Sequence, residues 1–444
     1  MPRATIQTAR PALRRLPTQS SRAVQAILQR LLPLLFKSQR LQLRNGNAAE
    51  GLAHEFHALQ TGQRSLLVTF RHPSPRDPLV MADLFWNRVP HAARQLGRSL
   101  QRPIELRFLY DRGIPLWAGP VIGWLLQRSG GIAIHRGRLD RPALSQARQV
   151  LAMGRHALVI APEGATNNLS GEMAPLEPGA AQLAFWAVED MAKAKDARAL
   201  HLVPIGIRYS WRRPNWSALD TRLRALERHL GVDDIENQAV VDRRERLLGI
   251  GAVLIDALER LERLKPTAGQ PLIDRIETYR LHGLQKAENH FGLKASGTLQ
   301  ERCRRIEQAA WDRIYRENLA QLPPLERSLA DWEAREANLQ LNRMRLVEHF
   351  TCVSGHYVSD QPDFDRFAEM VLIVEEAIGW IEDNPWKGEP SLGPQRVELS
   401  MGTSIAVDQR LRDYQHNRRK AVQQLTDDLE AEMERLMRPK LTSS

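Results

Sequence analysis

From about Leu66 the chain alternates between short apolar runs and longer stretches in which apolar residues recur every three or four positions. A short, nearly continuous apolar run predicts a strand that is buried on both faces, and the longer spacing predicts an amphipathic helix. The expected strands are residues 66–70, 104–110, 132–135, 157–161 and 202–209. The expected helices between them are residues 78–99, 115–129, 141–154 and 178–195. This alternation predicts an α/β fold with a sheet covered by helices on both faces.

The pattern changes after Tyr209, because residues 216–384 show almost only helical spacing and are highly charged. Strand-like spacing returns at residues 396–407, and a polar helix is expected for 408–437. We therefore expect four parts. They are an N-terminal segment (1–45), an α/β domain (46–211), a large all-helical insertion (212–394), and a return strand with the final helix of the α/β domain (395–437). The alternative is a simple C-terminal helical region.

The N-terminal segment is basic. Nine Arg or Lys residues and no acidic residue precede Glu50, so subtracting 9 from the net charge of +11 leaves only +2 for the rest. Residues 21–37 have the spacing of an amphipathic helix with a wide apolar face. We expect residues 1–45 to bind an anionic membrane surface. Two alternatives stay open, a helix docked on the domain core and a mitochondrial transit peptide.

Composition narrows the function classes. The only cysteines, Cys303 and Cys352, are too few for a disulfide framework and form no CxxC pair, which favours a reducing, cytoplasmic compartment. No metal-ligand spacing is visible, so we expect no metal and no cofactor. The longest uncharged run, residues 113–127, is too short to span a bilayer and contains two prolines. The small charge outside the N-terminal segment argues against nucleic-acid binding.

The segment from Arg71 to Pro78 carries the first candidate chemistry. Its three prolines prevent a helix directly after the 66–70 strand, so the segment must be a tight turn in which His72 and Asp77 can meet. A histidine that is oriented by a carboxylate is a good general base near neutral pH. The alternative is that Asp77 caps the helix beginning at Pro78 and His72 is an ordinary turn residue.

Three further motifs follow along the chain. Glu163 and Gly164 come directly after the 157–161 strand, where α/β folds place functional groups. Arg136 ends the 132–135 strand and is suited to binding a phosphate, although it could also lie in a solvated basic turn. Pro204 interrupts the 202–209 strand, which predicts an edge position or a special purpose for that strand.

In their order along the chain, which is His72 with Asp77, Arg136, Glu163 with Gly164, and Pro204, the four motifs resemble those of the glycerolipid acyltransferases. The best-known members of that family are the 1-acylglycerol-3-phosphate O-acyltransferases. The resemblance covers residues 50–210 and extends weakly to 395–437. It implies that His72 is the catalytic base and Asp77 its orienting partner. It also implies that Arg136, Glu163 and Gly164 help to form the acceptor site. Pro204 would shape the wall near the acyl chain.

The chain departs from the family pattern in three places. Arg71 stands where the family usually has Asn before the His, and Ala165 and Thr166 stand where it usually has Thr-Arg. Ala161 stands where it usually has an aromatic residue before the Pro. Arg71 or Arg76 could supply the missing positive charge, or the acceptor could carry a different headgroup.

The resemblance implies transfer of a fatty acyl group from acyl-CoA or an acyl carrier protein to the free hydroxyl of a lysophospholipid such as 1-acylglycerol-3-phosphate. This activity belongs to phospholipid biosynthesis, and the enzyme would be peripheral on the membrane. One alternative is a different acceptor, such as glycerol-3-phosphate. The other is a non-catalytic protein that binds or scaffolds at lipid surfaces on a degenerate acyltransferase fold.

Overall fold

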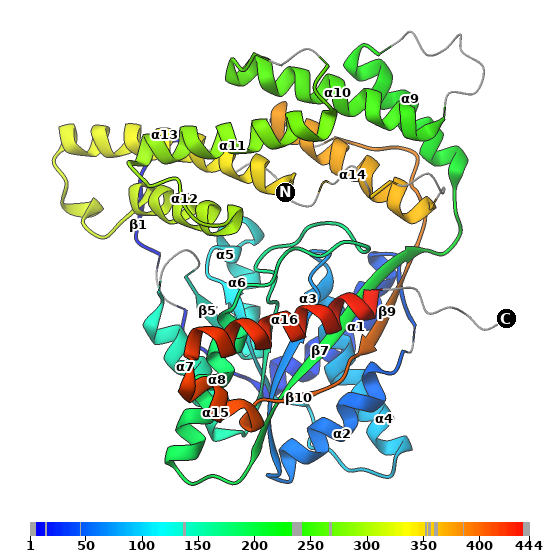
Figure 1. Cartoon of the computed structure of the whole chain (residues 1–444), viewed down its shortest axis with the longest axis vertical. Helices are drawn as coiled ribbons and strands as arrows, with labels where there is room; N and C mark the ends of the chain where they lie inside the picture. The colour runs from blue at the N-terminus through cyan, green and yellow to red at the C-terminus, as the bar shows by residue number, and fades with distance from the viewer. Residues whose placement is uncertain are drawn as a thin grey trace. The chain divides into compact units, whose positions relative to one another are not determined.

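The computed structural model of the chain describes ten stretches, which are residues 6–13, 16–44, 46–135, 139–232, 242–265, 269–350, 353, 357–358, 363–384 and 386–437 (Figure 1). They form two compact units. The α/β unit is built from residues 15–135, 140–212 and 393–444. The helical unit is built mainly from residues 1–14 and 213–392. We describe each unit by itself.

The α/β unit contains a twisted sheet that is mostly parallel. Its strand order is β2-β9-β7-β3-β6-β4-β5, and the short β10 also pairs with β7. The pairs β7–β9 and β7–β10 are antiparallel, and the other described pairs are parallel. The bounds are β2 (Leu41–Arg44), β3 (Arg64–Phe70), β4 (Leu106–Asp111), β5 (Gly131–Ile134), β6 (Ala157–Ile160), β7 (Ala199–Trp211), β9 (Gln395–Met401) and β10 (Ile405–Ala406).

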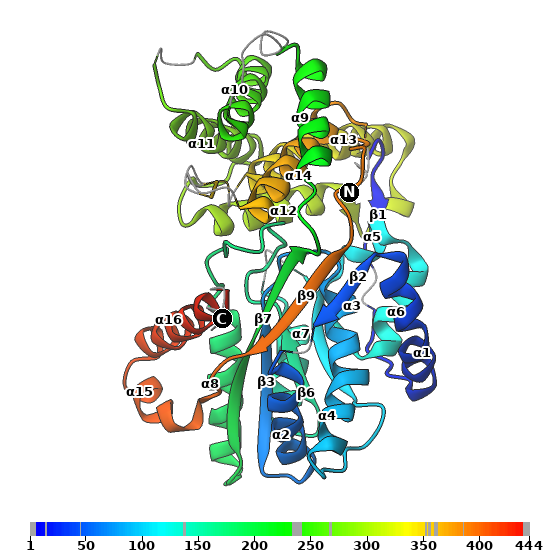
Figure 2. The ribbon, with the colours of Figure 1, turned by 90° about the vertical axis from the view of Figure 1, so that its right-hand side faces the viewer.

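Helices cover both faces of this sheet (Figure 2). Alternate residues of β3 show why, since Leu66, Val68 and Phe70 enter one hydrophobic core and Leu67 enters the other. The first core contains residues of α1 (Arg22–Ser38), α2 (Ala48–Gln60), α3 (Asp77–Asp83) and α4 (Val89–Gln95). The second contains residues of α7 (Arg141–Met153), α8 (Gly179–Lys193), α15 (Leu411–His416) and α16 (Arg418–Met437). This arrangement confirms the expected fold class.

The stretch 78–99, expected as one helix, is helical without a gap from Asp77 to Gln95, but its middle is irregular. It contains α3, a π-helical turn η1 (Leu84–Arg88) and α4. Pro90 explains the irregular turn, because it has no N–H to donate to the Trp86 carbonyl one turn earlier. That carbonyl instead accepts a hydrogen bond of 2.7 Å from the Gln29 side chain. The N–H of Val89 reaches back five residues, to Leu84.

The expected N-terminal segment 1–45 is divided between the two units. Residues 10 and 11 form β1 (Arg10–Pro11), which pairs with β8 (Tyr315–Arg316) in the helical unit. In contrast, α1 buries Leu32 and Phe36 in the core of the α/β unit, and β2 is an edge strand of its sheet. The boundaries expected from the sequence stay a prediction. In the structure α1 and β2 belong to the α/β unit, and β1 belongs to the helical unit.

The helical unit consists mainly of long helices linked by ion pairs. Glu262, for example, accepts hydrogen bonds from Lys286 at 2.8 Å and from Arg343 at 2.7 Å. Its described helices are α9 (Trp216–Leu230), α10 (Arg243–Glu262), α11 (Leu272–Phe291), α12 (Leu299–Ile314), α13 (Pro324–His349) and α14 (Phe364–Ile381).

The chain leaves the sheet of the α/β unit after β7 and returns to it in β9. At this point the N–H of Arg212 donates to the carbonyl of Pro394 at 3.0 Å.

Two short helices, α5 (Ile114–Ala118) and α6 (Pro120–Ser129), lie between β4 and β5. Gly119, with a φ of 91°, separates them. The chain before α1 packs against the end of α6, since the N–H of Ser21 donates to the Arg128 carbonyl at 2.9 Å. Across the described residues, no helix has both the length and the apolar character that a membrane span requires.

Candidate active site

The turn after β3 brings His72 and Asp77 together. The strand pairing extends to Arg71, whose N–H donates to the Ile205 carbonyl at 3.0 Å, and α3 begins six residues later. Within this turn, His72 Nδ1 lies 2.9 Å from Asp77 Oδ2. Asp77 is completely buried, whereas 21% of the His72 side chain is exposed. The pair therefore has one protected end and one end that solutes can reach.

The Asp77 carboxylate faces the turn and not the helix that follows it. Its Oδ2 also accepts the backbone N–H of Ser74 at 2.8 Å, and its Oδ1 accepts the Tyr209 hydroxyl at 2.5 Å. Arg76, not Asp77, occupies the N-cap position of α3, and no side chain caps that end. The helix-capping alternative for Asp77 therefore does not describe its contacts.

This arrangement fixes which nitrogen of His72 can exchange a proton. An ionised carboxylate only accepts hydrogen bonds, so Nδ1 carries the hydrogen and Nε2 keeps its lone pair. The Phe70 ring packs edge-on against the imidazole, with centroids 5.6 Å apart. A neutral imidazole held in this way can take a proton from a hydroxyl group at Nε2.

Glu163 binds the backbone N–H of His72. Its Oε1 accepts the His72 N–H at 2.8 Å and the Arg71 Nε at 3.0 Å, and its Oε2 accepts the Ala174 N–H at 3.1 Å. Only 1% of Glu163 is exposed. Both oxygens are thus occupied by protein donors, which differs from the expected contact with an acceptor molecule.

Arg71 is the largest fully buried side chain among the described residues. Besides Glu163 it contacts the sulfur of Met437, at the end of α16. Its remaining N–H groups bond to carbonyls of the loop after β6, at 2.9 Å for Glu172, 3.2 Å for Leu169 and 3.5 Å for Ser170. The guanidinium is saturated inside the protein, so Arg71 ties the loop to the turn that carries His72.

Of the other two expected cations, Arg76 and Arg136, the structure describes only Arg76. Arg76 is half-buried, and its guanidinium lies 4.9 Å from the centroid of the Tyr209 ring. It also donates to Gln395 at 2.5 Å and to the Ser74 hydroxyl at 3.2 Å. Arg136 lies outside the described residues.

The backbone conformation at Gly164 and the strand pairing at Pro204 explain why these residue types occur there. Gly164 has a φ of +73°, and a Cβ there would lie 2.3 Å from the Glu177 carboxylate. Pro204 belongs to a strand with neighbours on both sides, yet its carbonyl accepts the N–H of Gly402, which lies between β9 and β10. The N–H and C=O of one strand residue point to the same side. The N–H that Pro204 lacks would therefore point toward the segment between β9 and β10, where no strand pairs with β7.

Tyr209 completes the site, and no sequence motif marks it. It lies on β7, is only 3% exposed, and its N–H donates to the Ser170 hydroxyl at 3.2 Å. Burial raises the pKa of the Tyr209 phenol above its ordinary value, and the negative charge of Asp77 adds to the effect. Its 132-residue separation from Asp77 left no local signal.

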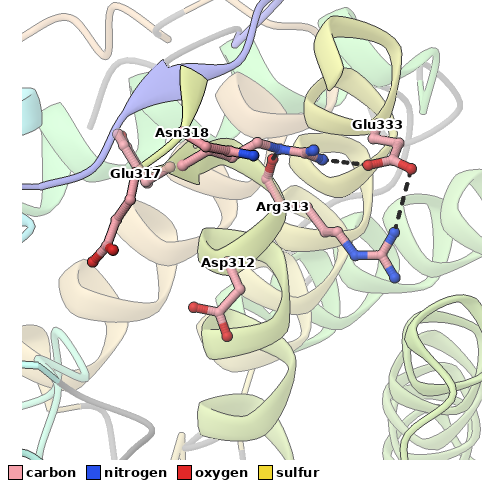
Figure 3. A pocket seen from close by; sticks show the side chains of 7 residues that line it. Asp312, Arg313, Glu317, Asn318 and Glu333 are labelled. Carbon is pink, nitrogen blue, oxygen red and sulfur yellow. Dashed lines mark hydrogen bonds and ion pairs between the residues drawn. The ribbon is translucent and has the colours of Figure 1, made fainter. Parts of the chain in front are cut away.

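The helical unit contains a surface hollow of a different character (Figure 3). There the Glu333 carboxylate forms ion pairs with Arg313 and Arg316. Its other lining residues are Asp312, Tyr315, Glu317 and Asn318. No histidine, cysteine or serine is among the described residues that line this hollow. In the part of the chain that the structure describes, no group of three His, Cys, Asp or Glu side chains could hold a metal ion.

Comparison with known proteins gives one family match. Residues 53–208 match the family model described as Acyltransferase. The matched range includes His72, Asp77 and Glu163, and it ends one residue before Tyr209. Searches of curated proteins and of solved structures found no match. The resemblance inferred from the four motifs is thereby confirmed. This part of the chain is a domain of the glycerolipid acyltransferase family.

Proposed function

We propose that the protein transfers a fatty acyl group from an acyl thioester, carried by coenzyme A or an acyl carrier protein, to the free hydroxyl of 1-acylglycerol-3-phosphate. His72 acts as the general base. The observation that carries this proposal is the contact of 2.9 Å between His72 Nδ1 and the buried Asp77 carboxylate, in a side chain that stays partly exposed. This arrangement favours catalysis over a non-catalytic lipid-binding role.

The reaction needs one proton to move twice. His72 Nε2 takes the proton from the acceptor hydroxyl while its oxygen attacks the thioester carbonyl, which gives a tetrahedral intermediate. The carbon–sulfur bond then breaks, and the imidazolium returns the proton to the departing sulfur, so a free thiol and a new ester result. Asp77 stabilises the imidazolium between the two steps. No metal or cofactor takes part, and no covalent bond to the protein forms.

The acceptor phosphate needs a cation near His72. Arg71 is unsuitable because its guanidinium is saturated and fully buried. Arg76 is in the same turn and half-buried, and Arg136 remains a prediction from the sequence. We propose that Arg76 binds the phosphate, while Glu163, Gly164 and Pro204 shape the surrounding backbone.

A panel of acceptors tests this function. With either donor type, 1-acylglycerol-3-phosphate should be acylated faster than glycerol-3-phosphate and faster than monoacylglycerol, which lacks the phosphate. Thiol release and ester formation should be measured together. Equal rates with monoacylglycerol would remove the phosphate assignment. Thioester binding without thiol release across the panel would instead support the scaffolding alternative.

We further propose that α1 places the enzyme on an anionic membrane. Beside its buried face, α1 exposes a continuous apolar stripe made of Ile27, Leu31, Leu34 and Leu35, of which 58%, 43%, 65% and 41% are exposed. The exposed Arg30 and Lys37 flank this stripe, and basic residues near an anionic bilayer contribute about 1 kcal/mol each. On the neighbouring α6, Val121 and Trp124 are also exposed. Docking and membrane contact are thus compatible uses of two faces of one helix.

Because α1 is part of the core, this surface is better tested by substitution than by deletion. The double variant Ile27→Gln, Leu34→Gln should bind anionic vesicles at least about tenfold more weakly, since each buried apolar side chain contributes roughly 1.5–3 kcal/mol. Acylation of a detergent-dispersed acceptor should stay near wild type. Vesicle sedimentation at low and high salt measures the effect.

The matched control is Met153→Gln, which changes an equally exposed side chain on α7, at the other face of the sheet. Equal vesicle binding by the double variant and the control would show that α1 is only a docked helix.

A further inference from the structure

We propose that Tyr209 is a positioning residue for acyl transfer, and that its hydroxyl holds Asp77 in place and limits how basic the Asp77–His72 pair becomes. This inference rests on the proposed function, in which His72 is the general base. Tyr209 is not a catalytic residue in the strict sense. It is 3% exposed and touches the carboxylate, not the imidazole.

The geometry gives each Asp77 oxygen a separate task. Oδ2 accepts His72 Nδ1 at 2.9 Å and the Ser74 N–H at 2.8 Å, whereas Oδ1 accepts only Tyr209, at 2.5 Å, among the described contacts. Without Tyr209 the turn would fix one oxygen and leave the other buried without a donor. The carboxylate would then be held at Oδ2 only. Holding both oxygens fixes the direction in which Asp77 presents its charge to His72.

Tyr209 is itself held rigidly. Its N–H donates to the Ser170 hydroxyl at 3.2 Å, within the loop that Arg71 ties to the turn. The guanidinium of Arg76 lies over its ring, at 4.9 Å from the centroid. The position of its hydroxyl is therefore set by β7 and by two further segments, and does not depend on a flexible side chain.

The hydroxyl also affects the charge balance of the site. Its hydrogen bond draws electron density from Asp77, so the carboxylate stabilises a protonated His72 less than it would alone. The other charged groups that contact this network are Arg76, Glu163 and Arg71, and the last two neutralise each other in a buried pair at 3.0 Å. Tyr209 keeps its proton at neutral pH, because burial raises its pKa. It therefore remains a hydrogen-bond donor to Asp77 at neutral pH.

The test is Tyr209→Phe, which keeps the ring and removes the hydroxyl. We expect kcat to fall roughly tenfold, the change expected from one charge-assisted hydrogen bond. The ascending limb of the pH–rate profile should move to higher pH, because the localised Asp77 charge holds the proton on His72 more firmly. KM for both substrates should not change. Asp77→Asn removes the charge and should move the same limb in the opposite direction.

Tyr110→Phe is the matched control. Tyr110 is a buried tyrosine on β4 of the same sheet, and its hydroxyl has no hydrogen-bond partner among the described residues. Its removal should leave rate and pH profile unchanged. The proposal for Tyr209 is overturned if the folded Tyr209→Phe variant keeps the wild-type rate. It is also overturned if the rate falls with no shift of the ascending limb, since a purely structural defect would act in that way.

The two levels of inference can fail separately. His72→Ala is measured in parallel, and a nearly wild-type rate in that variant would remove the proposed function itself. If His72→Ala is inactive while Tyr209→Phe keeps both rate and profile, only the role of Tyr209 fails. NMR titration of the His72 ring signals gives the same comparison without turnover.

Discussion

Replacing His72 by Ala is expected to lower the acylation rate by a factor of about 10²–10⁴, the usual effect of removing a general base. The variant should fold normally. The His72 side chain is partly exposed, and the ring makes one hydrogen bond, to Asp77. The Ser74 and Tyr209 donors would still satisfy both oxygens of that carboxylate. Single-turnover thiol release from the donor measures the chemical step directly.

His91→Ala provides the control, because His91 is an exposed histidine on α4 in the same unit. It should keep the full rate. A folded His72→Ala variant that retained more than about a tenth of the wild-type rate, well outside the range for a lost general base, would rule out this role for His72.

Replacing Arg71 by Met is expected to destabilise the α/β unit by about 3–5 kcal/mol, because it leaves the buried Glu163 carboxylate without its counter-ion. Three loop carbonyls would lose their donor as well. Arg71→Lys should restore little, since an ammonium cannot reproduce the fork of the guanidinium. A chain with two units need not unfold in one step, so hydrogen exchange of the β3 and β6 amides is the suitable measurement.

The comparison for this effect is Arg148→Met. Arg148 forms an ion pair of 2.5 Å with Asp190, but about a third of each side chain is exposed. Such surface pairs contribute no more than about 1 kcal/mol. If the β3 and β6 amides exchanged at the same rate in the two variants, the buried Arg71–Glu163 pair would not stabilise the loop after β6 more than a surface ion pair does.

The sequence predicted the elements of the α/β unit and the local part of its site. Periodicity located the five strands, and three prolines in one turn were enough to bring His72 to Asp77. Both kinds of inference depend on residues that are near one another along the chain, where propensity and sterics act directly.

What could not be predicted depends on the order of strands. Tyr209 reaches Asp77 only because β7 lies beside β3, and Arg71 meets Glu163 only because β6 lies on the other side. Neither neighbour can be read from a local pattern. The resemblance implied an acceptor role for Glu163, and Arg71 was one candidate for the missing positive charge. The structure pairs these two residues with each other in the interior. The four residues of β2 were too few for their period to be recognised.

The chain returns to the sheet beside the end of β7, where Arg212 and Pro394 are hydrogen-bonded, and this late return has a consequence for synthesis on the ribosome. β9, the neighbour of both β7 and β2, is made only after residues 213–392. At 5–20 residues per second this delay lasts roughly 10–40 s. During that time the 13-residue β7 presents an open edge to other nascent chains. Pro204 removes one donor from this edge, at the place where the finished sheet does not need it. The same proline that fits the folded ladder thus makes the unfinished one a poorer template for aggregation.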